Sequence, residues 1–306
     1  MIVLGARNII RSIPDNWTMI DIAKVAFGLI AVILVIAFYF LGISRLKQRS
    51  RVQAPRQDHI SNTELERNAR HIVLREIGGP GQKRLKEARV LVIGAGGLGA
   101  PALQYLAAAG IGTIGVIDDD VVENSNLQRQ VIHTDDRIGM PKVFSAEAAM
   151  TAQNPFVTVK PYHRRLTADI AAELFVDYDL ILDGTDDADT RYLVNKTAVA
   201  AKIPLISAAI TQWEGQISIF DPSRDAPCYA CVFPEKAADG LAPSCAEGGV
   251  LGPLPGVMGA MMAVEAIKHL ANTGEPLRGR MMIYDALYGE TRTIKIARRK
   301  ECAVCG

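Results

Sequence analysis

The chain has 306 residues, of which 49% are apolar, so it can bury a large core and is not a disordered protein. Its 34 lysines and arginines nearly balance its 33 aspartates and glutamates, which argues against nucleic acid as a main partner. The five cysteines are too few for a disulfide scaffold at this length and fit thiols that a cytosol keeps reduced.

The first sixty residues differ in character from the rest. Residues 25–43 read VAFGLIAVILVIAFYFLGI, an uncharged apolar run that is nearly long enough, at ~1.5 Å per helical residue, to cross a ~30 Å hydrocarbon core. We therefore predict a transmembrane helix over residues 22–44. The alternatives are a buried core helix and a cleaved signal peptide, whose apolar part is usually ~7–15 residues long.

The charges on either side of this run predict its orientation. Positive residues are in excess behind the run, and such an excess marks the cytoplasmic side. They are Arg45, Lys47, Arg49, Arg51 and Arg56, against Arg7, Arg11 and Lys24 in front. We expect a single-pass membrane protein with a non-cytoplasmic segment 1–21, a basic linker 45–62 and a cytoplasmic domain 63–306. The linker either contacts anionic lipid or is simply solvated.

A glycine fingerprint follows the first strand of the soluble part. The strand RVLVIG leads into Gly94, Gly96, Gly97 and Gly99, and an alanine-rich helical stretch follows. Residues without Cβ let a phosphate approach the backbone, and the helix N-terminus offers free N–H groups. A second strand, TIGVID, ends at Asp118, at the spacing where an acidic residue reaches a ribose hydroxyl. Alone, these features would indicate a dinucleotide enzyme, or a tight turn without a ligand.

The segment after Asp118 favours ATP over NAD. It contains Asn126 and Arg129 in NSNLQRQ, then Lys142 in GMPK. A dehydrogenase has no evident need for two cations and an asparagine here, whereas a triphosphate does, because charge must be neutralised as pyrophosphate leaves. Taken singly, either cation could be an ordinary surface residue.

Helical and strand patterns alternate along the middle of the chain. We predict helices over residues 142–153, 168–175 and 190–202, and strands over 157–162, 180–183 and 205–208. Such alternation predicts an α/β, Rossmann-like, doubly wound and mostly parallel sheet, with ligands at the carboxyl ends of the strands. Residues 215–220, 280–285 and 291–297 read as strands of a C-terminal antiparallel extension.

An aspartate cluster, DGTDDAD, follows the predicted strand 180–183. Its members Asp183, Asp186 and Asp187 suit Mg²⁺, which prefers oxygen ligands and bridges protein to phosphate. We favour Asp186 as the magnesium ligand. One of these aspartates could instead cap the next helix.

Two C-x-x-C pairs predict a structural zinc site. They are Cys228 with Cys231, and Cys302 with Cys305. Four thiolates in paired spacing suit tetrahedral Zn²⁺, which would fasten the C-terminal tail to the middle of the domain. Unrelated buried thiols or a redox pair are the alternatives. Cys245 is left over, in a loop rich in glycine and proline that precedes the predicted helix 257–270.

Several separated motifs resemble one known family. NLQRQ, the downstream G-x-P-K, the LDGTDD turn and ARHIVLREIGGPGQKRL look like the HesA/MoeB/ThiF family, and the likeness is closest to its molybdopterin-synthase adenylyltransferases. The resemblance covers roughly residues 64–306. It implies ATP-dependent adenylylation of the C-terminal glycine of a ubiquitin-like sulfur carrier, such as the molybdopterin-synthase small subunit or the thiamine sulfur carrier.

The resemblance also implies roles for individual residues. Gly97 would face the nucleotide, Asp118 would hold the ribose and Asp186 the magnesium, while phosphates would contact Asn126, Arg129 and Lys142. Arg70 on the leading helix would reach the triphosphate of a partner subunit, which implies a homodimer. Cys245 matches a cysteine that accepts the activated carrier as a covalent intermediate in some members; the alternative here is an inert or merely helpful thiol. The family often has asparagine where Asp187 stands, so the division of labour between Asp186 and Asp187 stays open.

The implied partners are a carrier protein that ends in Gly-Gly and a separate sulfur donor protein. The sequence does not identify the carrier. Two other functions remain as alternatives. One is a tRNA-modifying, ATP-dependent dehydratase of the same superfamily, whose pattern lacks the paired zinc cysteines. The other is a non-catalytic, membrane-tethered scaffold that binds nucleotide.

Overall fold

The computed structural model describes residues 27–28, 30–32, 60–236 and 248–306. The chain divides into two units, Met1–Asp58 and His59–Gly306, and only five residues of the first are described. The sheet, the helices that cover it and the candidate sites all belong to the second unit.

An eight-stranded sheet forms the centre of this unit, with the strand order β3-β2-β1-β4-β5-β6-β7-β8. The strands are β1 (Arg89–Ile93), β2 (Thr113–Asp118), β3 (Thr158–His163), β4 (Leu180–Asp183), β5 (Leu205–Ile210), β6 (Glu214–Phe220), β7 (Arg280–Asp285) and β8 (Glu290–Lys295). The first five strands in this order pair in parallel, and the last three join them antiparallel. The chain order reverses between β1 and β4, and such a reversal is where open α/β sheets bind ligands.

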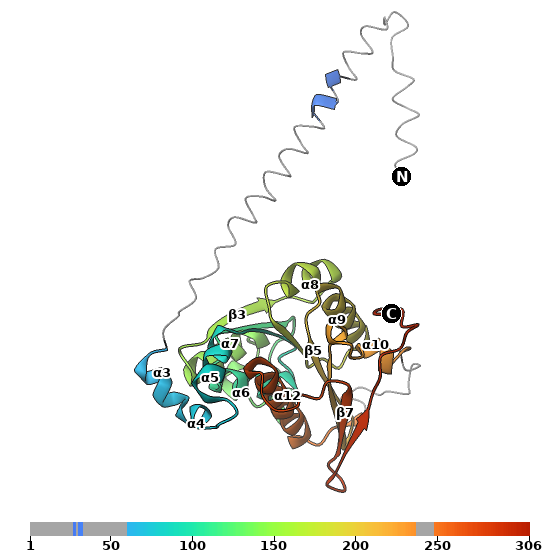
Figure 1. The fold of residues 1–306 in the computed structure, drawn as a ribbon. Helices are drawn as coiled ribbons and strands as arrows, with labels where there is room; N and C mark the ends of the chain where they lie inside the picture. Colours follow the sequence, from blue (N-terminus) through green and yellow to red (C-terminus); the bar gives the residue numbers. More distant parts are fainter. Residues whose placement is uncertain (1–26, 29, 33–59, 237–247) are drawn as a thin grey trace, which may run out of the picture. The chain divides into compact units, whose positions relative to one another are not determined.

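Helices cover both faces of the sheet (Figure 1). The α-helices are α3 (Asn62–Arg67), α4 (Ala69–Ile72), α5 (Gly78–Glu87), α6 (Gly99–Ala108), α7 (Lys142–Gln153), α8 (Ala168–Phe175), α9 (Ala188–Ala201), α10 (Tyr229–Val232) and α12 (Pro253–Ala271). Short 3₁₀ turns lie at η2 (Asn124–Asn126), η3 (Asp135–Arg137) and η4 (Pro222–Arg224). One core cluster joins the sheet to α5, α6, α7 and α12, and a second joins it to α8 and α9.

The central strand β1 shows how the sequence builds these two cores. Val90 and Val92 belong to the cluster on one face, whereas Leu91 and Ile93 belong to the cluster on the other. Successive side chains of a strand point to opposite faces, so a strand covered on both sides must be apolar at every position. All four side chains are at most 2% exposed. The continuous apolar run VLVI, residues 90–93, is therefore the sequence of a strand between two helical layers.

Most predicted elements agree with the structure, and the predicted α/β sheet with parallel and antiparallel strands is confirmed. The predicted helices 142–153 and 168–175 coincide with α7 and α8. The largest difference is α12, which begins at Pro253 instead of residue 257. Proline lacks a backbone N–H, and the first helical turn has no partner for that group, so Pro253 and Pro255 are accommodated there.

The prediction of a transmembrane helix, and with it of a single-pass membrane location, is corrected by the structure. Within the described ranges, no helix is both long and apolar enough to cross a bilayer. Of the predicted span 22–44, only residues 27–28 and 30–32 are described. Segment 1–21, the rest of the span and linker residues 45–59 lie outside the described residues.

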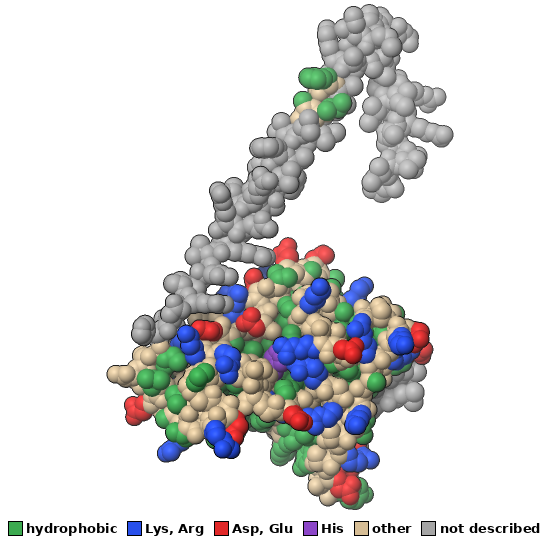
Figure 2. All heavy atoms as spheres, viewed as in Figure 1, with side chains coloured by type: hydrophobic (Ala, Val, Ile, Leu, Met, Phe, Trp, Pro, Cys, Tyr) green, Lys and Arg blue, Asp and Glu red, His purple; other side chains and the backbone are tan. Residues whose placement is uncertain are grey.

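Lysines and arginines are intermingled with aspartates and glutamates on the face of the described chain that Figure 2 presents. The arrangement agrees with the near-neutral charge of the sequence. Exposed ion pairs occur in the described chain, for example between Lys83 and Glu87 on α5, whose nitrogen and oxygen lie 3.9 Å apart. Such exposed pairs contribute little to stability.

Candidate nucleotide site and metal centre

The loop between β1 and α6, residues 94–99, is the centre of the candidate nucleotide site; we call it the glycine loop. Gly94 has φ +89°, a conformation that favours glycine. Gly99 opens α6 so close to the loop that a Cβ there would lie 1.9 Å from the carbonyl oxygen of Gly94. A Cβ on Gly96, in contrast, would meet no atom nearer than 3.8 Å. The fingerprint therefore contains glycines required by the fold and one that leaves open space.

The loop after β4 packs directly against the glycine loop. A Cβ on Gly184 would lie 3.0 Å from the backbone nitrogen of Gly99, and one on Gly94 would lie 3.4 Å from the carbonyl oxygen of Gly184. This contact follows from the pairing of β1 with β4, which sets Ile93 beside Asp183. The two predicted motifs, G-x-G-x-x-G and DGTDD, thus meet at the point where the strand order reverses.

The three aspartates of DGTDD have different surroundings. Asp183 is 1% exposed, accepts hydrogen bonds from Thr185 and Ser207, and lies 3.7 Å from the guanidinium of Arg191. Asp187 caps α9 by accepting from the backbone N–H of Thr190 at 2.9 Å. Its bonds with the Thr190 hydroxyl and N–H hold the pKa of Asp187 below its usual value.

Asp186 is exposed and forms no hydrogen bond or ion pair with any described residue. The alternative role, in which one of these aspartates caps the next helix, therefore belongs to Asp187. Of the three carboxylates, Asp186 is the one without a partner among the described residues, which suits a ligand.

Asp118, at the end of β2, holds the glycine loop in place. Its carboxylate accepts from the backbone N–H of Ala95 at 2.7 Å and from that of Asp120 at 2.8 Å. Burial raises the pKa of Asp118, while the positive charge of Lys142 and these hydrogen bonds oppose the rise. Asp118, which we expect to bind the ribose, therefore also holds the glycine loop through its hydrogen bond with Ala95.

Lys142, the first residue of α7, lies in the same cluster. It is 5% exposed, and its ammonium donates to the carboxylate of Asp120 at 2.7 Å. Its backbone N–H donates to the carbonyl of Asp120 at 3.0 Å, which ties the start of α7 to the end of β2. The predicted phosphate-binding lysine is thus held in place and charge-balanced by its neighbour.

The NLQRQ segment folds as a turn beside the glycine loop. Asn126 is buried, and its side-chain oxygen accepts from the backbone N–H of Glu123 at 3.3 Å. Arg129 donates to the carbonyl of Ser125 at 3.0 Å, and its Cγ lies 3.8 Å from where a Cβ on Gly97 would stand. The stem of Arg129 therefore lies beside the glycine loop, and its guanidinium is held by the carbonyl of Ser125.

His133 is a part of the site that the sequence reasoning missed. Its ring is buried and bonds through Nε2 to the carbonyl of Ala95 and through Nδ1 to the hydroxyl of Ser145, both at 2.9 Å. Burial lowers the pKa of His133, and the charges of Lys142 and Arg137 act in the same direction. In the neutral ring Nε2 therefore donates to Ala95 and Nδ1 accepts from Ser145. Only its nearness to NLQRQ could have signalled this role.

Two further predicted residues lie outside this assembly. Arg70 is exposed on α4, and no contact among the described residues joins it to the glycine loop. Cys245 lies outside the described residues. Their roles remain predictions.

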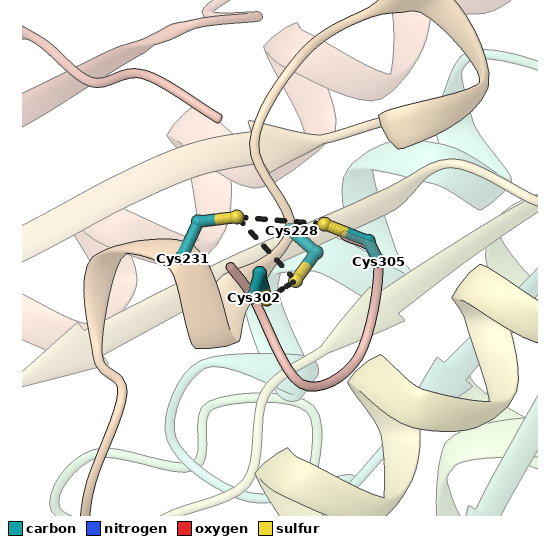
Figure 3. Close-up of side chains that lie close together, drawn as sticks. All are labelled: Cys228, Cys231, Cys302 and Cys305. Atoms are coloured by element: carbon teal, nitrogen blue, oxygen red, sulfur yellow. Dashed lines mark hydrogen bonds between the residues drawn. The ribbon is translucent and has the colours of Figure 1, made fainter. Parts of the chain in front are cut away.

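The four paired cysteines converge as predicted (Figure 3). Neighbouring sulfurs are 3.6 Å apart between Cys228 and Cys302, 3.4 Å between Cys231 and Cys305, and 3.9 Å between Cys228 and Cys231. All four ligand atoms lie within 4.8 Å of one another. A tetrahedral zinc ion with Zn–S bonds of ~2.3 Å keeps its sulfurs about 3.8 Å apart, so the geometry fits zinc; a disulfide would need ~2.05 Å.

Hydrogen-bond donors reach two of the sulfurs, and the pKa values of the thiols shift in different directions: burial raises those of Cys228 and Cys305, whereas that of Cys302 is lowered. Asn195 donates to the sulfur of Cys228 at 3.7 Å, and the backbone N–H of Arg299 donates to that of Cys231 at 3.4 Å. Burial acts to raise the pKa of Cys302, but backbone donors at Val304 and Cys305 bring it down to about 7. Hydrogen bonds to ligating sulfurs are the outer support that metal sites normally have.

Comparison with known proteins gives the same assignment for most of the chain. The model of the ThiF family matches residues 68–304. The sulfur carrier protein adenylyltransferase of Thermus thermophilus is 47% identical over 247 residues, which cover 79% of this chain and 91% of that protein. The molybdopterin-synthase adenylyltransferase of Salmonella typhimurium is 44% identical over 250 residues, covering 81% and 98%. A crystal structure of E. coli MccB is 26% identical, with a TM-score of 0.67 and coverage of 74% and 67%. The chain therefore belongs to the ThiF family.

Proposed function

We propose that this protein uses ATP to adenylylate the C-terminal glycine of a ubiquitin-like sulfur-carrier protein. The observation that carries the proposal is the 47% identity to a sulfur carrier protein adenylyltransferase, over a match that covers 91% of that relative. The close contact between the glycine loop and the DGTDD loop supports it, because the two loops meet at the edge of the sheet where such sheets bind ligands.

The reaction needs positioning and charge neutralisation more than covalent help from the protein. A carboxylate oxygen of the carrier's last residue attacks the α-phosphorus of ATP, the bond from this phosphorus to the bridging oxygen breaks, and pyrophosphate leaves. The products are an acyl-adenylate and pyrophosphate. We assign Arg129, Lys142 and Asn126 to the phosphates and Asp118 to the ribose. Cations fixed near the leaving phosphates stabilise the charge that develops there.

Asp186 is the residue that we assign to Mg²⁺, since Asp183 is paired with Arg191 and Asp187 caps α9. Magnesium is usually held by one or two carboxylates together with substrate phosphates. It would neutralise phosphate charge beside this loop. The four-cysteine cluster would hold Zn²⁺ as a structural ion, fastening residues 302–305 to α10, and it leaves no ligand position for a substrate.

The partner assignments complete the proposal. The protein would act as a homodimer, in which Arg70 reaches the triphosphate of the other subunit. Sulfur would come from a separate donor protein after activation of a carrier that ends in Gly-Gly. Cys245 would be placed to accept the activated carrier.

The test is pyrophosphate exchange into ATP by the full chain, with purified carriers that end in Gly-Gly and with NAD binding as a control. Exchange that depends on a carrier is the expected result. Arg129→Ala should lower the exchange rate by roughly two to three orders of magnitude, the effect of losing one charge-stabilising donor. Lys83→Ala, which removes a surface cation on α5, should leave the rate unchanged. NAD binding without use of ATP would overturn the proposal.

A further inference from the structure

An open groove lies at the edge of the sheet opposite to the glycine loop. Phe220, the last residue of β6, pairs with Leu205 at the start of β5, whereas the glycine loop leaves the carboxyl end of β1, which runs in the same direction as β5. The groove has a volume of about 790 Å³, and we call it the basic groove. It is lined by residues 224–227, 278–279, 296–298, 300 and 306. None of these belongs to the candidate nucleotide site.

Four cationic side chains and one carboxylate line the basic groove. The cations are Arg224, Arg278, Arg298 and Lys300, and the carboxylate is that of Asp225. The side chain of Asp225 is 97% exposed and lies 3.9 Å from Arg298, so solvent weakens this pair. The ammonium of Lys300 forms no hydrogen bond or ion pair with any described residue. The groove therefore keeps positive charge that a ligand can neutralise.

A buried carboxylate beneath the groove holds two of the cations in position. Asp221 is 1% exposed, accepts a hydrogen bond from Nε of Arg278 at 3.1 Å and lies 3.8 Å from Nε of Arg224. Another nitrogen of Arg278 donates to Nδ1 of His269 at 3.1 Å, and burial lowers the pKa of His269, which favours the neutral ring that can accept. A guanidinium has five N–H donors, so both arginines retain donors for a ligand. With Asp221 and Asp225 counted, two cationic side chains remain in excess.

The exposed lining of the groove is cationic, whereas its buried lining is apolar. Ala226 and Pro227 are buried, and Ile296 is half-buried. The cysteine cluster packs the C-terminal tail against α10 (Figure 1), and the guanidinium of Arg298 donates to the carbonyl of Cys305. Both walls of the groove are thus held by the fold. One water molecule occupies about 30 Å³ in the liquid, so a single inorganic ion would leave most of the groove empty.

We propose that the basic groove docks an extended, acidic segment of a partner protein. Successive side chains of an extended chain point in opposite directions, so acidic side chains can meet the cations while small apolar ones contact Ala226, Pro227 and Ile296. Guanidinium groups pair well with carboxylates because the two planar groups form parallel hydrogen bonds. The inference does not depend on the proposed use of ATP, since the groove and the nucleotide site share no residue. A small anionic metabolite is the competing occupant.

The test measures the binding of short labelled peptides to the full chain by fluorescence anisotropy. The probe is an eight-residue peptide that alternates glutamate with valine. It should bind more tightly than a glutamate–glycine peptide of the same charge, because glycine has no apolar side chain for the buried lining, and a lysine–valine peptide should not bind. Salt should weaken the binding, because the Debye length falls from about 10 Å at 0.1 M to ~3 Å at 1 M ionic strength.

Two double variants with the same change in net charge locate the site. Arg224→Gln with Lys300→Gln should raise the dissociation constant of the glutamate–valine peptide by about 3- to 10-fold, the scale of two exposed ion pairs. Lys83→Gln with Lys160→Gln removes two exposed cations on α5 and β3, and the constant should stay within about twofold of the wild type because the removed charges lie far from the groove. Both variants should melt at the wild-type temperature, since all four side chains are exposed.

Several results would overturn the inference. A wild type that does not bind the glutamate–valine peptide would remove the site, and equal weakening in the two double variants would reduce it to general charge attraction. Weaker binding together with a lower melting temperature of Arg224→Gln with Lys300→Gln would make these cations supports of the fold. Displacement of the peptide by inorganic pyrophosphate as readily as by unlabelled peptide would identify a site for small anions.

The proposed function fails or stands separately. A wild type that exchanges pyrophosphate with a carrier but binds no acidic peptide would refute this inference alone. A wild type that binds the peptide but exchanges no pyrophosphate with any carrier would refute the proposed function alone.

Discussion

Gly96 and Gly99 belong to one sequence fingerprint, yet the structure predicts opposite results when each is replaced by alanine. A Cβ on Gly99 would lie 1.9 Å from the backbone oxygen of Gly94 and 3.6 Å from the Val92 side chain. A Cβ on Gly96 would have the Gln130 amide at 3.8 Å as its nearest neighbour, an ordinary van der Waals contact.

The size of each effect follows from these distances. A carbon and a carbonyl oxygen rarely approach closer than about 3.3 Å, so Gly99→Ala must move α6 and the glycine loop apart by more than an ångström. Overpacking typically costs about 1–3 kcal/mol and occasionally more. Because neither the Cβ nor the carbonyl oxygen can rotate away from the collision, we expect a cost of about 3 kcal/mol or more. Gly96→Ala should be neutral or should stabilise the fold by up to about 1 kcal/mol, since alanine restricts the unfolded chain.

Urea unfolding measures the two stabilities, and pyrophosphate exchange with a carrier measures the activities. We expect Gly99→Ala to lose both. Gly96→Ala should keep its stability and lose exchange, because its methyl group fills the open space that a phosphate needs beside the loop. A Gly99→Ala variant as stable as the wild type would refute the steric reasoning. A fully active Gly96→Ala variant would refute the idea that phosphate approaches there.

Three more predictions concern the supports of the site. Arg191→Met removes the ion-pair partner of the buried carboxylate of Asp183, so the free energy of unfolding measured in urea should fall by about 3–5 kcal/mol. Lys83→Ala, which breaks an exposed pair, should change that free energy by less than ~1 kcal/mol. Equal effects of the two mutations would contradict the importance of burial. Cys305→Ser should reduce the bound zinc measured by elemental analysis and lower the melting temperature, and a variant with full zinc content and wild-type melting would rule out the staple. Burial holds the pKa of His133 below its ordinary value, so as the pH falls below ~6.5 the unfolded chain is protonated at this histidine before the folded one, and stability is lost. His133→Gln should therefore lose less stability than the wild type between pH 7 and 5.5. Parallel curves of stability against pH for the two proteins would argue against the lowered pKa.

Much of the fold could be predicted because its signals are local. The apolar run of β1 identifies a strand covered on both faces, and the alternation of helices and strands identifies a mostly parallel sheet. The spacing of the two C-x-x-C pairs was enough to predict that their cysteines meet, although Cys228 and Cys302, like Cys231 and Cys305, are 74 residues apart in sequence. The apolar run near the N-terminus misled us: length and hydropathy alone do not distinguish a membrane span from other apolar segments, and among the described residues no helix meets both criteria.

The sequence by itself determined which residue types the site contains: a glycine fingerprint, two cations, a cluster of aspartates and four cysteines. Only the tertiary structure decided what each member does. It pairs Asp183 with Arg191, uses Asp187 as a helix cap, and leaves Asp186 and the side-chain oxygen of Gln130 without partners among the described residues. The reason is physical. Residue identity fixes what a group can bond to, but whether that capacity is already used depends on neighbours brought close by strand pairing and helix packing.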